Sequence, residues 1–547
     1  MKMNKKMRRL CALVLAFAAV PLTGCVGGGG KSSSSEGDKS HGLTGTITIA
    51  IPLTTKEEQV MKAVADAYME KNPFVTVAVD AKGAADYKDW LSQTLTETDM
   101  NNVTMDIVKN NEVSQYYGSN KFVDFSQYLG EANPYYNNQV WGETIEPTAY
   151  IANGSNGQVY SLNFETTQVL IYYNKTLLTE AQVNPTEITD WDKFAEACAK
   201  IKALDKGYTP IAISGDRLSF WSGQMSWLFR VYVDQYFRSV ADEVHTREGD
   251  WNFDPLSDAE WSYKPNVSDW TGLSEEDATR AALNNDGLGY KMNELRLLEG
   301  VMTEKWGQND PRYKDMLTNF LKVFPEYVGT GFGADNQDTA MNAFWNGTAG
   351  FTIMTTDLLN DWQLRDNKNF ELGTMDFVPM LDNQSYVGGA PDINYTRSIG
   401  GAHGYYGVVN KNAKQTALCM DFIKFWTSKE GQEAAFEKRE EINFLLTGTP
   451  LIKGLVIPSS INALEGITLR GIADYNPATY FARGLQNEGN STRAYQENTQ
   501  KLFAGQISVE EYGATMSAKH KEFMPAYLES RGFKLNALDD VTKYPFN

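Results

Sequence analysis

Cysteine and histidine are scarce in this sequence, which has only four residues of each among 547. The four histidines show no paired spacing, which argues against a zinc site. The sequence also lacks a P-loop, a dinucleotide-binding fingerprint and a G-x-S-x-G nucleophile motif. We therefore expect no metal, no cofactor and no catalytic centre. Cys198 and Cys419 lie in helical patterns and are expected to be small buried residues, although a disulfide between them is an open alternative.

Apolar runs long enough to span a membrane are also lacking. The apolar run Leu10–Val20 is too short to cross a bilayer of about 30 Å as a helix. It follows a basic start and precedes Leu22–Cys25, with the sequence Leu-Thr-Gly-Cys, which is the order of a bacterial lipoprotein signal. We predict that residues 1–24 are a signal peptide and that Cys25 carries diacylglycerol and palmitate. The alternative is an ordinary secretory signal with an incidental cysteine.

The segment 25–43 is rich in glycine and serine and has almost no apolar side chains. Such a segment cannot bury enough surface to fold, so we expect a flexible tether that holds the protein at the extracytoplasmic face of the cell membrane. The formal charge of −19 repels nucleic acid, so no nucleic-acid partner is expected. The remaining chain, roughly 500 residues, is long enough for two or three lobes.

The folded body opens with an alternation of strand and helix patterns. Apolar residues alternate at 47–51 and again at 75–79, and helical spacing lies between these two stretches. The pair Thr54–Thr55 stands three residues before Glu57–Glu58, which is a doubled capping-box signal. Strand, helix and strand in this order predict a parallel sheet that is covered by helices.

The same two periods recur along the rest of the chain and predict an α/β fold. The stretch 245–310 shows no clear period and is interpreted as an irregular insertion. The other predicted elements are strands at 105–108, 159–165, 169–175, 350–354 and 405–409, and helices at 90–95, 191–204 (capped by Thr189 or Asp190), 340–346 and 418–425, with a further helix capped by Thr355, Thr356 and Asp357.

The order of these segments resembles the large extracellular solute-binding proteins of ABC importers, the group that includes maltose-binding protein. The resemblance runs from about residue 44 to the last helices. It is carried by Tyr160–Leu162 leading to Tyr172–Lys175, by Trp191–Phe194, by Ala343–Gly350, and by Phe422–Trp426 running into Glu430–Gln432.

This resemblance implies a periplasmic-binding-protein-like fold, with two α/β lobes joined by hinge strands around a central ligand cleft. One lobe would take 44–162 plus 405–447, and the other would take 163–404 plus 448–547. Ligand that contacts both lobes would favour the closed form. The implied function is a monomeric, lipid-anchored binding protein that captures a carbohydrate, in particular an oligosaccharide, and delivers it to permease subunits without acting as an enzyme.

Three alternatives to this function stay open at the level of sequence. The ligand could be a non-sugar solute such as a peptide. The protein could serve sensing or adhesion rather than import. A surface glycoside hydrolase is the least favoured, because it needs two carboxylates about 5–9.5 Å apart and no pair of carboxylates is marked by its setting.

Loops at the carboxyl ends of strands are the first place to look for ligand contacts in such a fold. Asn110, Asn111 and Glu112 follow the strand that ends at Val108, and are otherwise a solvated turn. By resemblance, Glu165 and Thr167 lie at the first crossover, where the family often places a ligand hydrogen bond. Phe220 and Trp221 match an aromatic stacking position, with core packing as the alternative.

Three further positions complete the predicted site. Asp357 matches a loop where sugar-binding relatives often carry an aromatic residue; here it favours recognition of hydroxyl groups, or it is a plain helix N-cap. His403 lies between glycines near the last hinge, and a structural histidine is the alternative. Tyr480 and Arg483 match a late helix that often lines the cleft, and are otherwise an ordinary helix face.

Overall fold

The structure is a computed structural model that describes most of the chain after residue 41. The described residues are 42–53, 56–109, 116, 119–146, 149, 158–255, 291–366, 368–380, 396–463, 473–485 and 489–546. The predicted signal peptide, Cys25 and nearly all of the tether lie outside them, as do Asn110, Asn111 and Glu112.

The chain folds into two compact units, and it passes between them three times. Unit 1 consists of Met1–Thr166 and Ala402–Ala463, and unit 2 consists of Thr167–Gly401 and Leu464–Asn547. The boundaries expected from the sequence follow residues 162, 404 and 447, so the main difference is the segment 448–463. This segment belongs to unit 1 because Leu451 is buried in its core and accepts a hydrogen bond from the Glu146 N–H at 2.7 Å.

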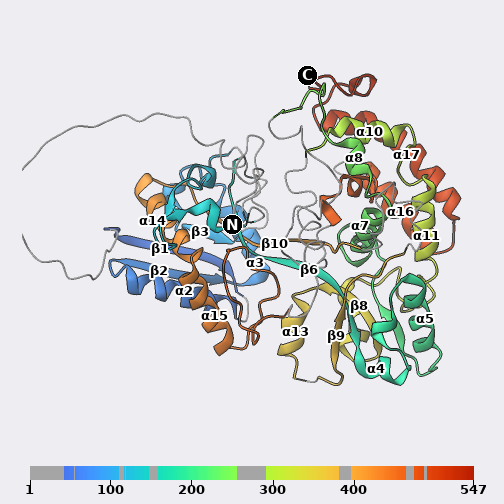
Figure 1. Cartoon of the computed structure of the whole chain (residues 1–547), viewed down its shortest axis with the longest axis horizontal. Helices are drawn as coiled ribbons and strands as arrows, with labels where there is room; N and C mark the ends of the chain where they lie inside the picture. The colour runs from blue at the N-terminus through green and yellow to red at the C-terminus, as the bar shows by residue number, and fades with distance from the viewer. Residues whose placement is uncertain are drawn as a thin grey trace, which may run out of the picture. The chain divides into compact units, whose positions relative to one another are not determined.

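The sheet of unit 1 has the strand order β2-β1-β3-β10 (Figure 1). Strand β1 runs parallel to β2 and to β3, whereas β10 runs antiparallel to β3. The strands are β1 (Gly45–Pro52), β2 (Val75–Lys82), β3 (Ile107–Lys109) and β10 (Gly400–Val408), and the short pair β4 (Ala132–Asn133) and β5 (Gln139–Val140) lies apart from the sheet.

Helices cover both faces of this sheet. Ile47, Ile49 and Ile51 point to the face that is covered by α2 and α14, and α15 packs on α2. Ala50 and Val108 point to the opposite face, which is covered by α3. The helices are α2 (Glu57–Lys71), α3 (Ala84–Thr94), α14 (Ala413–Trp426) and α15 (Lys429–Glu441). Alternate residues of these strands therefore point to opposite faces of one sheet, and both faces are buried.

The predicted capping box at the start of α2 is wrong. The N-cap residue is Lys56, which makes no side-chain cap hydrogen bond, and Thr54 and Thr55 lie outside the described residues. The Lys56 ammonium group instead donates to the carbonyl oxygens of Ile442 at 2.7 Å and Asn443 at 2.9 Å. A cation is stabilised at the C-terminal end of a helix, so this residue ties α2 to the end of α15.

The sheet of unit 2 is built on β6, which begins in unit 1 and continues into unit 2. Strands β6 and β8 are antiparallel, β7 and β8 are parallel, and β9 pairs antiparallel with β6. The strands are β6 (Leu162–Asn174), β7 (Thr209–Ala212), β8 (Ala349–Thr355) and β9 (Leu372–Met375).

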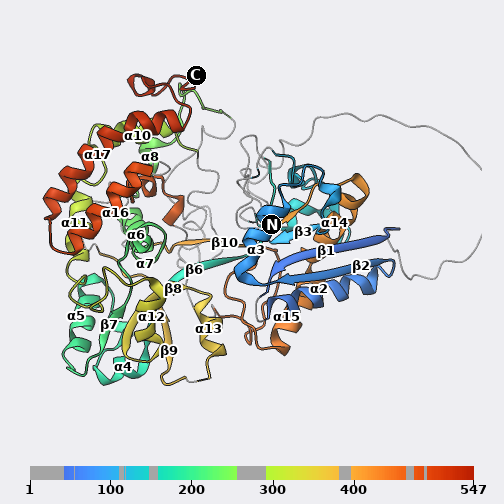
Figure 2. The same ribbon diagram turned by 180° about the vertical axis from the view of Figure 1, so that it is seen from behind.

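A thick layer of helices packs against this second sheet (Figure 2). Phe194 of α5 packs on Phe351 of β8, and α12 and α13 cover the other face. The helices are α4 (Lys175–Glu180), α5 (Trp191–Lys202), α6 (Arg217–Ser222), α7 (Gln224–Tyr236), α8 (Val240–Val244), α10 (Glu294–Met302), α11 (Pro311–Phe320), α12 (Gln337–Trp345), α13 (Leu358–Leu364), α16 (Gly489–Phe503) and α17 (Val509–Ser530).

The predicted α/β fold is confirmed, as are most of its predicted elements. Helix α5 begins after Asp190, whose side chain accepts a hydrogen bond from the Lys193 N–H, as a helix cap requires. Cys198 and Cys419 are buried free thiols, so the alternative of a disulfide between them is excluded in this structure. The stretch 245–310 contains one regular helix among its described residues, α10.

Candidate functional site

In unit 1, charged side chains meet where β1 and β3 end. Parallel strands bring their carboxyl ends to the same edge of a sheet, which is where ligands of such folds bind. Lys109 ends β3, and its ammonium group lies 2.6 Å from Oε1 of Glu57, the first residue of α2. Tyr406 of β10 pairs with Lys109 in the sheet and donates its hydroxyl to the same Glu57 oxygen at 2.8 Å.

Three aromatic rings form the wall beside this polar group. Phe164 stacks on Trp426 with ring centroids 3.8 Å apart, and Tyr406 meets Trp426 edge to face at 4.7 Å. Burial and the neighbouring Glu57 carboxylate raise the pKa of Tyr406 well above its usual range, so its hydroxyl remains a hydrogen-bond donor.

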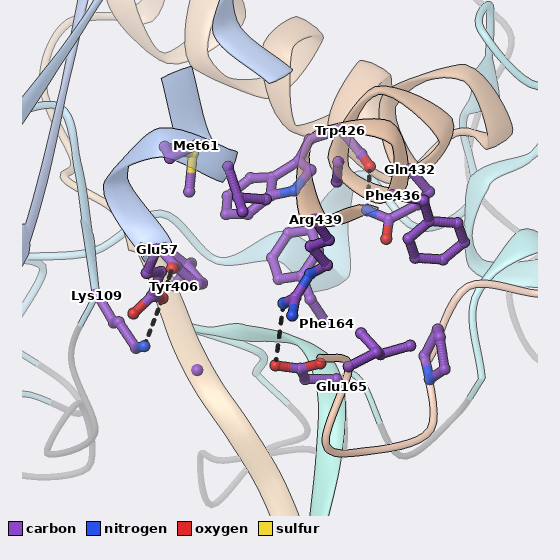
Figure 3. Close-up of a pocket in the computed structure, with 15 residues that line it drawn as sticks. Glu57, Met61, Lys109, Phe164, Glu165, Tyr406, Trp426, Gln432, Phe436 and Arg439 are labelled. Carbon is purple, nitrogen blue, oxygen red and sulfur yellow. Dashed lines mark hydrogen bonds and ion pairs between the residues drawn. The ribbon is translucent and has the colours of Figure 1, made fainter. Parts of the chain in front are cut away.

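Glu165 and Arg439 close the other side of the same pocket (Figure 3). Arg439 Nη2 lies 3.6 Å from Glu165 Oε1, and Glu165 Oε2 has no hydrogen-bond partner among the described residues. The cavity volume is about 70 Å³, small against the roughly 300–1,000 Å³ of ligand pockets, so it can hold only part of a ligand. The lining residues are Glu57, Val60, Met61, Lys109, Phe164, Glu165, Gly404, Tyr406, Trp426, Gln432, Ala435, Phe436, Arg439, Leu446 and Pro450.

In unit 2, the carboxyl ends of β7 and β8 are held together by Gln224, the first residue of α7. Its side-chain oxygen accepts from the Ser214 N–H at 2.9 Å, and its side-chain nitrogen donates to the Ile353 carbonyl at 2.9 Å. Gln224 is fully buried. It therefore fixes the loop that follows β7, which leads into α6 and Trp221, against the end of β8.

Phe220 and Trp221, predicted together, have different environments. Phe220 is fully buried and packs against Phe229, Phe332 and Phe503 of the unit 2 core. A ring enclosed in this way cannot stack on a ligand. For Phe220 the structure therefore favours the alternative of core packing over the predicted stacking role. Trp221 is only partly buried and faces Arg483, so its predicted role stays open.

Arg483 is the most unusual cation at this end of unit 2. Its guanidinium lies 4.9 Å from the Trp221 ring centroid, and its Nη1 donates to the Trp221 carbonyl and, at 3.2 Å, to Ser226 Oγ. Burial and the positive charge of Arg230 lower the pKa of Arg483 to about 10, which leaves it protonated at neutral pH. Arg230 is itself paired with Asp474 at 2.6 Å.

Asp357 and Thr167 lie at this same sheet edge. Asp357 occupies the N-cap position of α13, but its side chain makes no cap hydrogen bond and is instead 3.3 Å from Thr355 Oγ1. Asp357 therefore takes the predicted N-cap position without the side-chain hydrogen bond of a helix cap. Thr167 precedes Gln168, whose carbonyl accepts from the Thr356 N–H at 2.8 Å. Both residues stay candidates for ligand contact.

Two predicted residues remain, Tyr480 and His403. Tyr480 belongs to the short 3₁₀ helix η11 (Pro477–Phe481), so the predicted late helix is only one turn long and ends before Arg483. Burial and the charge of the Glu294 carboxylate raise the pKa of Tyr480. His403 lies in β10 close to the Gly401–Ala402 division between the units, and its role stays a prediction.

Sequence reasoning missed several residues of these two groups. Lys109 could have been predicted, because it directly precedes the predicted Asn110 and also ends a strand. No sequence pattern indicated Arg439, because it lies in a highly charged helix and approaches Glu165 only in the folded chain. Trp426 was considered only as part of the segment that carries the family resemblance, and it forms a wall of the pocket.

Two α/β units that carry charged and aromatic side chains at the carboxyl ends of their parallel strands define a binding protein of the two-lobed type. The sequence model of the bacterial extracellular solute-binding protein family matches residues 63–447. The chain belongs to this family, as its sequence predicted, and its members act outside the cytoplasm. Among the residues described by the structure, no helix is both long and apolar enough to cross a membrane.

Solved structures with the same fold are distant in sequence. The cyclic alpha-maltosyl-1,6-maltose binding protein from Arthrobacter globiformis is 15% identical, with a TM-score of 0.52 over 88% of this chain and 98% of that one. A chitin oligosaccharide binding protein is 15% identical, with a TM-score of 0.51 over 88% and 98%. A structure on xylan utilization by the thermophilic bacterium Caldanaerobius polysaccharolyticus is 17% identical, with a TM-score of 0.51 over 87% and 99%. A comparison with curated proteins gives no match.

Proposed function

We propose that this protein is the substrate-binding component of an ABC importer and that it captures an oligosaccharide. The family match over residues 63–447 carries the proposal, because this family binds solutes outside the cell. The names of the similar structures support a carbohydrate ligand, since they include maltose- and chitin-derived oligosaccharides.

The side chains at the two strand-end sites suit a sugar. A sugar ring presents hydroxyl groups and a weakly apolar face, so it is bound by carboxylates and amides together with flat aromatic rings. Unit 1 offers Glu165 beside Phe164 and Trp426, and unit 2 offers Asp357 and Trp221.

The proposed action is reversible capture without bond cleavage, and the proposed location is the outer face of the membrane through a lipid on Cys25. Replacing Cys25 by alanine should release the protein from the membrane fraction into the medium, because a lipid chain is then lacking. Retention of Cys25→Ala in the membrane fraction would contradict the lipid anchor and leave the binding function untouched.

A thermal-shift screen of oligosaccharides and short peptides tests the ligand class. A ligand at 100 times its Kd stabilises a protein by about 2.7 kcal/mol, which is readily seen as a higher Tm. We expect at least one oligosaccharide to raise the Tm and to be recovered intact afterwards. Stabilisation by peptides alone would overturn the carbohydrate proposal, and release of new reducing ends would overturn binding without catalysis.

A further inference from the structure

Several arginines of the described residues bind a carboxylate through the same edge of the guanidinium group, although Arg230 holds Asp474 through Nη1. The Nε and Nη2 groups point the same way and form a two-donor edge that matches the two oxygens of a carboxylate. Four arginines of the described residues use this edge on an acidic side chain: Arg296 on Asp250, Arg312 on Asp310, Arg397 on Asp234 and Arg531 on Glu294.

Arg483 has the same edge without a carboxylate. Its two hydrogen bonds, to the Trp221 carbonyl and to Ser226 Oγ, both come from Nη1, on the other side of the guanidinium. Neither Nε nor Nη2 has a hydrogen-bond partner among the residues that the structure describes, and Nε also lacks contact with solvent. Arg483 as a whole is only partly buried, so a ligand that approaches this edge would reach Nη2 first.

The charge around Arg483 is not balanced within the described part of unit 2. The carboxylate of Asp474 lies close enough to act on the charge of Arg483, and it is already paired with Arg230 at 2.6 Å. Two guanidinium groups therefore face one carboxylate. Ser226 lies in the first turn of α7, whose N-cap Gly223 provides no side-chain cap, so the helix dipole adds positive potential at the same place.

The position of Arg483 matches that of a ligand-contacting residue. Gln224 holds the start of α7 at the carboxyl ends of β7 and β8, and Ser226 two residues later holds Arg483. The Trp221 ring lies against the guanidinium at 4.9 Å and keeps its plane oriented. A fixed, charged, two-donor edge at a strand-end loop is suited to one planar anionic group.

We propose that Arg483 binds a carboxylate of the ligand, and that the captured oligosaccharide therefore contains a uronic acid residue. The inference rests on the proposed function, which supplies the carbohydrate class of the ligand. The environment of Arg483 supplies the expectation that this carbohydrate bears a carboxylate. The carboxylate of a uronic acid is attached directly to the sugar ring. It can thus accept from Nη2, the donor that an approaching ligand reaches first, while the ring stays close to Trp221.

Matched pairs of ligands test this assignment on the full-length protein. Oligosaccharides of galacturonate, glucuronate and mannuronate are titrated calorimetrically beside their methyl esters, which keep the sugar but remove the charge. We expect at least one acid to bind roughly tenfold to a hundredfold more tightly than its ester, as a charge-assisted bidentate pair allows. This preference should shrink as the salt concentration rises.

Variants then assign the preference to Arg483. Arg483→Gln should abolish the preference of acid over ester, and Arg483→Lys should retain only part of it, because lysine keeps the charge but lacks the planar edge. Arg493→Gln, which removes an exposed arginine of α16 in the same unit, should leave the preference intact. If the Tm shows that Arg483→Gln fails to fold, the acid-over-ester preference of Arg483→Lys tests the assignment instead: a reduced preference supports it, and an unchanged preference overturns it.

The outcomes separate this inference from the proposed function. Equal affinity for acids and esters, binding of neutral oligosaccharides only, or an acid preference that survives at full strength in Arg483→Gln would overturn the inference and leave carbohydrate capture standing. Binding of carboxylate-bearing peptides but of no carbohydrate would overturn both.

Discussion

The indole ring of Trp426 stacks on the ring of Phe164, with centroids 3.8 Å apart and planes inclined by 20°. Phe164 comes from β6, the strand that continues into unit 2, and Trp426 is the last residue of α14. The stacking therefore fixes the unit 1 end of β6 on the helices of unit 1, next to Glu165.

Replacing Trp426 by alanine should lower the free energy of unfolding of unit 1 by about 3–5 kcal/mol, because a nearly buried ring leaves a cavity. Urea unfolding followed by circular dichroism measures this change. Phe74→Ala is the matched control, since Phe74 is 68% exposed and its removal should cost less than about 0.5 kcal/mol. Equal losses for the two variants would show that the stacked pair is not part of the core.

Gly448 is expected to tolerate no side chain. A Cβ atom at this position would lie 1.3 Å from the backbone oxygen of Thr166, and the neighbouring Thr449 carbonyl accepts from the Thr166 N–H at 3.0 Å. Gly448→Ala should therefore push the 448–450 segment off β6 and destabilise unit 1 by about 1–3 kcal/mol or more. Gly333→Ala, with open space around it, should cost little, and a neutral Gly448→Ala would contradict the close approach.

Much of the fold could be predicted from the sequence, because short-range patterns specify strands and helices. The alternation at Ile47–Ile51 and the cap at Asp190 are both local signals, and both are confirmed. The cap of α2 was mispredicted because Lys56 bonds to carbonyls nearly four hundred positions away in the chain, and no local pattern records such a contact.

The candidate site was less predictable than the fold for the same reason. Strand-end position identified Asp357 and Trp221, but it could not separate Trp221 from its neighbour Phe220, which the core encloses. The charged side chains that surround Glu165 and Arg483 lie far away from them in sequence. Arg439 and Arg230 reach them only when the units have folded.

Acid should weaken unit 2 through Asp234. Burial opposes ionisation of this carboxylate, but Arg238 and Arg397 outweigh it and lower its pKa to about 2. An unfolded aspartate titrates near pH 3.9, so below about pH 4 the unfolded state binds the proton first. About 2–3 kcal/mol of stability is therefore present above pH 4 and lost as the pH falls towards 2.

Asp234→Asn tests this contribution by urea unfolding as a function of pH. Removing one partner of a buried ion pair should cost about 3–5 kcal/mol at pH 7 and should flatten the loss between pH 4 and 2. Asp192→Asn is the control, because the Asp192 side chain is 68% exposed and its pair with Lys322 should contribute about 1 kcal/mol or less. An unchanged acid slope in Asp234→Asn would contradict the assignment.

His520 should cause a second loss of stability, which begins in weaker acid. Burial lowers its pKa to about 4, and neither ring nitrogen has a hydrogen-bond partner among the described residues. Because an unfolded histidine titrates near pH 6.5, stability should fall by about 3 kcal/mol as the pH drops from about 6.5 to 4. His520→Leu should remove this slope and leave stability at pH 7.5 unchanged or higher. A slope that persists in His520→Leu would assign the loss to other groups.

The most direct test of the account is a calorimetric titration of the full-length protein with oligosaccharides that stabilise it, carried out on the parent and on two variants, Glu165→Ala in unit 1 and Trp221→Ala in unit 2. If one sugar is captured by strand-end residues of both units, the parent binds it and each variant weakens binding by about tenfold or more, which corresponds to about 1.4 kcal/mol. Binding of peptides but of no carbohydrate, or a sugar affinity that neither variant changes, would contradict the account.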